Sequence, residues 1–211
     1  AFINNGGTLP TIPTWQLAET SIQNFLAFGD FDGDGWEDLA VSKWANFETG
    51  IYKNITGVLQ TTPVWTTGGT TTDKGVAWAD VDGNGWLDLV VGRNPTALYT
   101  NSAGSLAVTW TSGATFFGHS ELRFCDVNRD GWPDLAEVHF SDGKVHIYLN
   151  RNGVLDTAPS WTYDSPTVGT ALAFGDINGN GWPALVVGNS GKPCVKVFLA
   201  RPPLAGDLNG D

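Results

Sequence analysis

The sequence predicts an all-β fold that is assembled from one unit repeated four times. The first observation is an apolar run that leads into a glycine-rich acidic loop, at residues 26–42, 76–92, 122–138 and 172–188. The second is a tryptophan that recurs at nearly the same interval, at Trp15, Trp65, Trp110 and Trp161. The third is an N-x-x-G turn that begins at Asn4, Asn54, Asn101 and Asn150. A unit of about 45–50 residues with four short strands is typical of one blade of a β-propeller.

Four strands are expected in each unit. The first is the run LAFGD or a variant of it, which leads into the acidic loop. The second, DLAVS or DLVVG, is continuously apolar and suits a strand that is covered on both faces. The third, such as GIYKN or VHIYLN, carries aromatic residues in alternation, and the N-x-x-G turn leads from it to a fourth strand such as PVWTT. No segment shows a sustained helical period.

The chain is strongly acidic. Its 22 acidic and 11 basic side chains give a net charge of −11. This charge argues against a nucleic-acid partner, because affinity for phosphates comes from clustered Lys and Arg, and against an anionic membrane surface. No apolar stretch approaches the roughly 20 residues of a transmembrane helix, so we expect no membrane insertion. Twelve of the 22 acidic residues lie in the four loops, which makes the loops the main source of the acidity.

The acidic loops have the residue types and spacing of a calcium site. Loop 1 reads D-x-D-x-D-G-x-x-D, so that carboxylates alternate in a tight turn and converge on one point. Calcium takes six to eight oxygen ligands at about 2.3–2.6 Å, and in the similar EF-hand loop the seventh residue contributes its carbonyl oxygen. The predicted ligands of loop 1 are the side chains of Asp30, Asp32, Asp34 and Asp38 and the carbonyl of Trp36.

The other loops repeat this pattern with fewer charges. In loop 2 the predicted ligands are Asp80, Asp82, Asn84, Asp88 and the carbonyl of Trp86. In loop 3 they are Asp126, Asn128, Asp130, Asp134 and the carbonyl of Trp132. In loop 4 they are Asp176, Asn178, Asn180 and the carbonyl of Trp182, and Ala184 replaces the closing acid. Because affinity follows ligand charge, we expect about three calcium sites and a fourth that is weak or empty. The alternative is that Asp, Asn and Gly serve only as turn formers.

These loops resemble those of a known repeat family. Phe28-Gly29 and Phe174-Gly175, together with the D-x-D-G-D-G-W-x-D-L pattern, resemble the FG-GAP and VCBS repeats of integrin-α-like β-propellers and of some fungal lectins. Ala40-Val41-Ser42 and Val90-Val91-Gly92 stand where the GAP element would be, which favours the VCBS variety. The resemblance covers residues 1–200. It implies calcium between the first and second strands of each blade, and rings of more than four blades, often seven.

The ends of the chain leave the number of blades open. Residues 1–17 match the third and fourth strands of a unit, so they could complete the last blade, although they would duplicate its third strand. The four units could form a small ring or part of a larger, for example seven-bladed, one. We therefore assign residues 1–200 to the propeller, and residues 201–211 to a linker and a truncated calcium-loop-like segment.

The functional expectation is a secreted, calcium-binding recognition module without catalytic activity. Its partner would be a glycan or an extracellular protein, as in lectins or adhesion proteins, and it could be attached to further repeats or domains. The alternative is a propeller that is accessory to, or part of, a secreted carbohydrate-active enzyme. His119, His139 and His146 belong to no catalytic motif, and we predict no catalytic residue.

Two tryptophans break the repeat and are candidates for contact with a ligand. These are Trp44 and Trp78, since a tryptophan offers a flat apolar face with a polar edge. Ordinary packing is the alternative for Trp44. The tryptophans that recur in every unit are expected to be packing residues.

Overall fold

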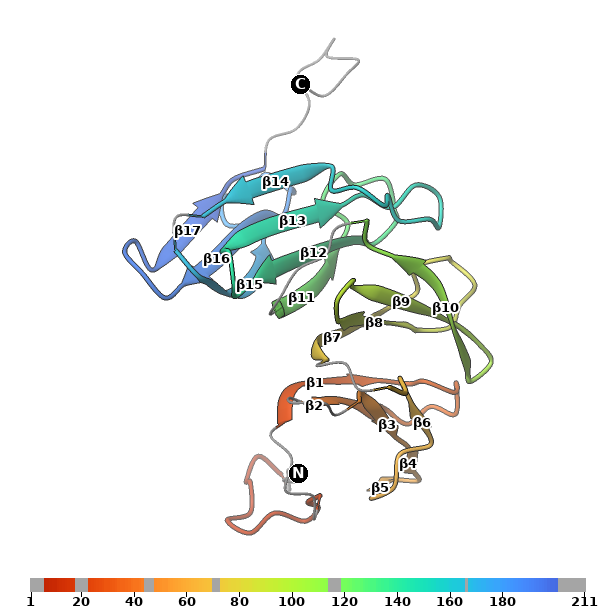
Figure 1. Cartoon of the computed structure of the whole chain (residues 1–211). Coiled ribbons are helices and arrows are strands. Elements are labelled where there is room, and N and C mark those ends of the chain that lie inside the picture. The colour runs from red at the N-terminus through yellow and green to blue at the C-terminus, as the bar shows by residue number, and fades with distance from the viewer. Residues whose placement is uncertain are drawn as a thin grey trace.

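The protein is described from a computed structural model, which covers residues 6–17, 23–43, 48–69, 73–113, 119–165 and 167–200. All regular elements within these ranges are strands, and every strand pair is antiparallel. They form four small sheets that follow one another as the blades of a propeller, in an arc (Figure 1). The prediction of an all-β propeller is thus confirmed. The described part of the chain contains no helix long and apolar enough to cross a membrane.

Blades 1 to 3 each have four strands, and three are described in blade 4. Blade 1 contains β1 (Gln23–Gly29), β2 (Asp38–Lys43), β3 (Gly50–Tyr52) and β6 (Trp65–Thr66), with a hairpin of β4 (Asn54–Ile55) and β5 (Val58–Leu59). Blade 2 contains β7 (Lys74–Ala79), β8 (Asp88–Gly92), β9 (Ala97–Ser102) and β10 (Ser105–Thr111). Blade 3 contains β11 (His119–Cys125), β12 (Asp134–His139), β13 (Lys144–Tyr148) and β14 (Trp161–Asp164). Blade 4 contains β15 (Gly169–Gly175), β16 (Ala184–Asn189) and β17 (Val195–Phe198).

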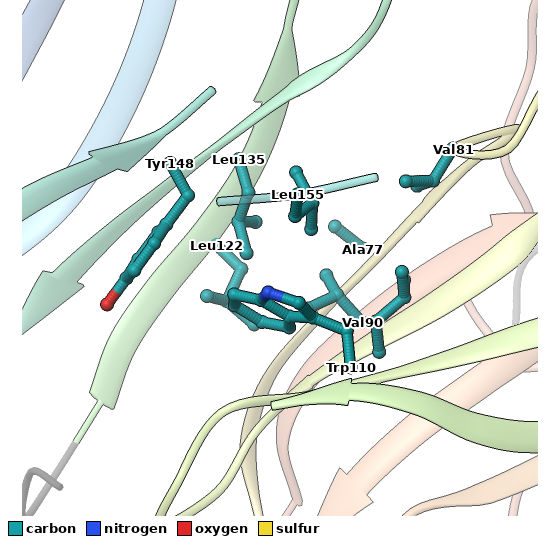
Figure 2. Packing of buried hydrophobic residues seen from close by; sticks show 9 residues of the cluster. Ala77, Val81, Val90, Trp110, Leu122, Leu135, Tyr148 and Leu155 are labelled. Carbon is teal, nitrogen blue, oxygen red and sulfur yellow. The ribbon is translucent and has the colours of Figure 1, made fainter. Parts of the chain in front are cut away.

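The hydrophobic core lies between the blades. The second strand of blades 1 to 3 is buried along its whole length, which explains why apolar residues predominate in it. Figure 2 shows the cluster between blades 2 and 3, in which Ala77, Val90 and Trp110 face Leu122 and Leu135 across the interface. Corresponding clusters join blade 1 to blade 2 and blade 3 to blade 4.

The recurring fourth-strand tryptophans pack edge-to-face on an aromatic residue in the third strand of the next blade. Trp65 lies 5.0 Å from Tyr99 between ring centroids, and Trp110 lies 5.4 Å from Tyr148. Trp161 packs likewise on Phe198 at 5.3 Å. This arrangement confirms the packing role predicted for these side chains, since T-shaped contacts of this kind are favourable in cores.

The segment before blade 1 continues the same arrangement. Trp15 packs edge-to-face on Tyr52 of β3, with ring centroids 6.2 Å apart, and so occupies the seat of a fourth-strand tryptophan from a preceding blade. On β1, however, Leu26 and Phe28 remain 61% and 55% exposed. At the other end, Val195 and Val197 of β17 are also exposed. Both end blades therefore present apolar side chains of the kind that the internal interfaces cover.

Candidate metal centres in the acidic loops

Loop 1 is folded around the carboxylate of its first aspartate. Asp30 accepts hydrogen bonds from the backbone N–H groups of Asp34 (3.1 Å) and Gly35 (2.9 Å). Gly33 and Gly35 have φ angles of 70° and 85°, a left-handed conformation that glycine adopts without strain. The backbone therefore curls around Asp30 and brings the later carboxylates back towards it.

The closing aspartate of each of the first three loops is buried, and its hydrogen bonds join the loop to the turn after the third strand. Asp38, the first residue of β2, is completely buried, and it accepts N–H bonds from Phe31 (3.0 Å) in its own loop and from Asn54 (2.7 Å) in the turn after β3. Asp88 and Asp134 make the equivalent pairs of bonds at 2.7–2.9 Å. Burial raises the pKa of all three carboxyl groups above the usual range, because desolvation disfavours the charged form.

Loops 1 and 2 bring their carboxylates within reach of one cation. Oxygens of Asp30, Asp32 and Asp38 all lie within 4.8 Å of one another, and a second such group comprises Asp80, Asp82 and Asp88. Two oxygens bound to the same calcium ion lie at most about 5 Å apart, since each Ca–O bond is about 2.3–2.6 Å long. The residues present therefore fit a calcium ion.

One atom in each of these two loops strengthens that fit. The Oδ1 atoms of Asp32 and Asp80 are buried and have no hydrogen-bond partner. A buried carboxylate oxygen without a partner is costly, and a bound cation would satisfy it. The turn-former explanation accounts for the backbone of the loops but not for these two atoms.

Lys53, which follows β3, contacts loop 1, although nothing in the repeat pattern predicts this contact. Its ammonium group pairs with Asp32 and lies 3.2 Å from the Oδ2 atom of Asp34. Hydrogen bonds to these two carboxylates raise the pKa of Lys53. The pKa of Asp34 is lowered, first by the N–H of Trp36 and also by Lys53. Lys53 offsets one of the four aspartates in loop 1, so the candidate ligands of this loop carry about the same net charge as those of loop 2.

Loops 3 and 4 share the turn but not the gathered carboxylates. In loop 3, Asp126 accepts from Asp130 and Gly131, whereas in loop 4, Asp176 accepts from Asn180 and Gly181 in the same way. Among the described residues, only loops 1 and 2 contain three carboxylates within 4.8 Å of one another. Loop 4 forms the turn with a single carboxylate, so the turn does not itself require a metal. The predicted ligands of loops 3 and 4, Asn128 and Asn178 among them, stay a prediction.

Loops 1 and 2 are each fastened to the next blade by the asparagine of the N-x-x-G turn. The side-chain amide of Asn101 in blade 2 donates to the carbonyl of Phe31 in loop 1 at 2.7 Å, and Asn150 in blade 3 donates to the carbonyl of Val81 in loop 2 at 2.8 Å. Gly104 of the same turn packs against Asp32, where an added Cβ atom would lie 3.3 Å from the Asp32 Cβ atom. We call Asn101 and Asn150 the turn latches. From the sequence, these two residues are predicted only to form turns.

The loop tryptophans cover the preceding loop. Trp86 lies over Gly33 of loop 1, so closely that an added Cβ atom would come within 2.7 Å of its ring, and Trp132 lies over Gly83 in the same way. In loop 3 the corresponding position is Arg129, whose guanidinium lies 5.5 Å from the ring centre of Trp182. These contacts confirm the predicted packing role of the recurring tryptophans. The predicted ligation by their carbonyl groups remains a prediction.

Of the two irregular tryptophans, only Trp78 belongs to the described residues. Trp78 lies between blades 1 and 2, where its Nε1 donates to the carbonyl of Ala27 at 3.3 Å and its ring packs on Phe31. Packing accounts for this position. Trp44 lies outside the described residues, as does the predicted segment 201–211. Trp36 at loop 1 is 43% exposed and lies against Gly57.

An apolar cavity lies between blades 3 and 4, at a place where the equivalent space between blades 2 and 3 is filled by a side chain. The cavity has a volume of about 690 Å³, and Val127, Trp161 and Phe198 contribute to its lining. Between blades 2 and 3 the equivalent space is filled by Leu155, which follows the turn of Asn150 and is buried (Figure 2). In blade 4, Ala200 stands where the turn asparagine would be, and it is the last described residue.

Comparison with known proteins supports the assignment of the repeat and the fold. Residues 126–187, which run from the first aspartate of loop 3 into β16, match the model of the FG-GAP-like repeat. The resemblance expected from the sequence is therefore confirmed for this stretch. No curated protein matches the chain.

Two solved structures share the architecture. Both are crystal structures of BBS1N in complex with ARL6DN, one soaked with lead and one with mercury, and each is 18% identical to this chain with a TM-score of 0.53. The alignments cover 87% and 93% of this chain, but only 54% and 58% of those chains. The chain thus spans little more than half the length of these neighbours, and at this identity the similarity concerns the fold alone.

Proposed function

We propose that the chain is a calcium-stabilised, non-catalytic recognition module that is secreted and binds an extracellular glycan or protein. The observation that carries the calcium part is the pair of unpartnered, buried oxygens of Asp32 and Asp80, each within a group of three carboxylates. Bound calcium would supply positive charge to these groups, while the chain's own carboxylates and carbonyls hold it between the first two strands of a blade.

The physical role of the ion follows from the latches. Loop 1 contacts Asn101 of the next blade through a carbonyl adjacent to its ligands, so a loop ordered by calcium also fixes the blade that follows. If each site has a dissociation constant near 10 µM, millimolar calcium stabilises the folded state by about 2.7 kcal/mol per site. Affinities of this order suit an extracellular setting, where free calcium is in the millimolar range.

The recognition part rests on the fold and on its repeat. A propeller offers a rigid scaffold with loops on its edges, which suits glycan and protein partners alike. BBS1N, one of the structural neighbours, is in complex with a protein, ARL6DN, which favours a protein partner. The half-exposed ring of Trp36 beside loop 1 favours a glycan, since sugars stack on aromatic faces that are exposed at one side.

Two experiments test the two parts. A calorimetric titration of the chelator-treated chain with calcium should find binding in loops 1 and 2, and Asp32→Asn and Asp80→Asn should each remove one site. A glycan array probed with and without calcium then tests recognition, with Trp36→Ala as the matched variant because its ring is exposed. Absence of heat on calcium addition would refute the calcium part. Lack of any glycan signal at saturating calcium would leave the protein partner as the proposal.

A further inference from the structure

Blade 3 contains a buried group of metal-binding side chains that is separate from the acidic loops. Glu137 and His139 on β12 are completely buried, and His146 and Tyr148 on β13 are buried beside them. Glu137 and His146 face each other in the register of the two strands. The group lies on the side of blade 3 that packs against blade 2, because the hydroxyl of Thr96 in blade 2 donates to Glu137 Oε2 at 2.7 Å.

This group departs from the repeat. The position of Glu137 is occupied by Val41, Val91 and Val187 in the other three blades, which shows that an apolar residue satisfies the packing. The position opposite, that of His146, is occupied by Gly50, Ala97 and Lys196. Burying a carboxylate costs several kcal/mol unless it is compensated by charge and hydrogen bonds. The packing of the blades therefore does not require a glutamate and a histidine at these two positions.

The distances from Glu137 to the two histidines are close to those between ligands of a tetrahedral metal site. Glu137 Oε1 lies 3.1 Å from His139 Nε2 and 3.4 Å from His146 Nδ1. The hydroxyl of Tyr148 lies 2.7 Å from the same oxygen and 3.4 Å from His146 Nδ1. Zinc binds nitrogen and oxygen at about 2.0–2.2 Å, so two neighbouring ligands of a tetrahedral site are about 3.3–3.5 Å apart.

Neighbouring groups are placed as outer partners of such a site. Asp142 Oδ1 lies 3.5 Å from Nδ1 of His139, on the side of the ring opposite to Glu137. A metal-bound histidine usually directs its second nitrogen at a carboxylate or carbonyl, which fixes the orientation of the ring. Thr96 holds the second oxygen of Glu137 in the same manner, from another blade.

The geometry points to a site for a divalent transition metal of the zinc class, bound by Glu137, His139 and His146. Two imidazoles and one carboxylate select zinc over calcium, which prefers oxygen ligands alone. The fourth position belongs to the hydroxyl of Tyr148 or to a water molecule. Because Thr96 comes from blade 2, the ion would hold blades 2 and 3 together.

The test uses the whole chain, stripped of metal and then saturated with calcium so that the acidic loops do not compete. Titration with Zn²⁺ should show one equivalent bound, and Co²⁺ in its place should give the intense visible absorption of a four-coordinate site. Glu137→Val installs the residue of the other three blades, and His146→Ala installs that of blade 2. Both should weaken zinc binding by more than the roughly 10–100-fold that loss of an outer partner costs.

Control variants separate this site from the calcium loops and from general unfolding. Asp82→Asn in loop 2 should keep the zinc and cobalt response, and circular dichroism should show that Glu137→Val keeps the fold. The proposal is overturned if the calcium-saturated chain takes up no stoichiometric zinc. It is equally overturned if Glu137→Val and His146→Ala both bind zinc as tightly as the parent, because the ion would then be held elsewhere.

Discussion

Replacing Asn150 with alanine removes the side chain that fastens blade 3 to loop 2. Its amide donates to the carbonyls of Val81 (2.8 Å) and Pro133 (3.2 Å), and its oxygen accepts from the N–H of Gly153 at 2.8 Å. Each hydrogen bond contributes about 1 kcal/mol net, so Asn150→Ala should lower the free energy of unfolding by about 3 kcal/mol. The carbonyls of Val81 and Pro133 lose their donor, and any of them that stays buried and unsatisfied adds to this loss of stability.

Blade 1 supplies a matched control for this substitution. Asn54 occupies the same position of its turn, but its amide donates to the carbonyl of Glu37 alone, at 3.1 Å, and its oxygen has no hydrogen-bond partner. With one bond instead of three, Asn54→Ala should cost about 1 kcal/mol. The comparison holds the residue type and its position in the turn constant, and Asn54 lacks both the contact with a preceding loop and the bond from the N–H within its turn.

The assay is urea unfolding of both variants and the parent at one fixed, saturating calcium concentration. The expected result is a difference of about 2 kcal/mol between Asn150→Ala and Asn54→Ala. Calcium titrations of Asn150→Ala should also show weaker binding in loop 2, because Val81 belongs to that loop. Equal losses for the two variants would refute the idea that the turn asparagine joins one blade to the next.

Three further predictions follow from the loops. Chelation should lower the melting temperature of the parent, and Asp82→Asn should reduce the shift that calcium restores; an unchanged melting temperature in chelator contradicts a stabilising ion. Lys53→Thr, which installs the residue of blade 2, should tighten calcium binding in loop 1 several-fold in calorimetry, since an internal cation no longer competes. In chelator, the closing aspartates should make stability fall as pH rises, from the ordinary pKa of 3.8 to their raised folded values, because the folded state then binds more protons than the unfolded state; calcium should reverse this slope, as thermal melts at several pH values would show.

Features that recur with the repeat could be predicted from the sequence. The fourth-strand tryptophans and the apolar second strands keep their period, and the structure places them in equivalent contacts, as with Trp65 on Tyr99 and Trp110 on Tyr148. The turn around Asp30 could likewise be predicted, because each step of it depends on residue types only a few positions apart. Contacts that repeat from blade to blade require the same residue types at the same interval, so they can be recognised in the sequence.

The turn latches could not be predicted in this way. Asn101 donates to the main-chain carbonyl of Phe31, 70 residues away in the sequence. Because every residue has a main-chain carbonyl, the sequence does not indicate which one accepts this bond. The asparagine is also a common turn former, so its recurrence has a sufficient local explanation. Only the placement of one blade on the next shows that it acts across the interface.

The roles of Lys53 and Glu137 were not predicted either, although both residues visibly depart from the repeat. Lys53 stands where blades 2 and 3 have Thr100 and Leu149, and Glu137 stands where the other blades have valine. Trp78, which did break the pattern, was interpreted as a ligand platform, whereas the structure places it between two blades. In a repeat protein, a residue that departs from the pattern indicates that its surroundings differ from those of the equivalent residues in other blades. The sequence does not show whether these different surroundings are other parts of the protein or a ligand.

The turn latches also determine where such a chain can be divided. The loop around Asp30 is fastened by Asn101, and the loop around Asp80 by Asn150, so each candidate metal centre extends from one blade into the next. The stretch that holds both parts of the first centre runs from Asp30 to Asn101, and that of the second from Asp80 to Asn150, so the two stretches overlap. Any gene duplication or engineered deletion that joins the chain within these stretches separates an acidic loop from its own asparagine, and the blade brought alongside has to supply an equivalent one.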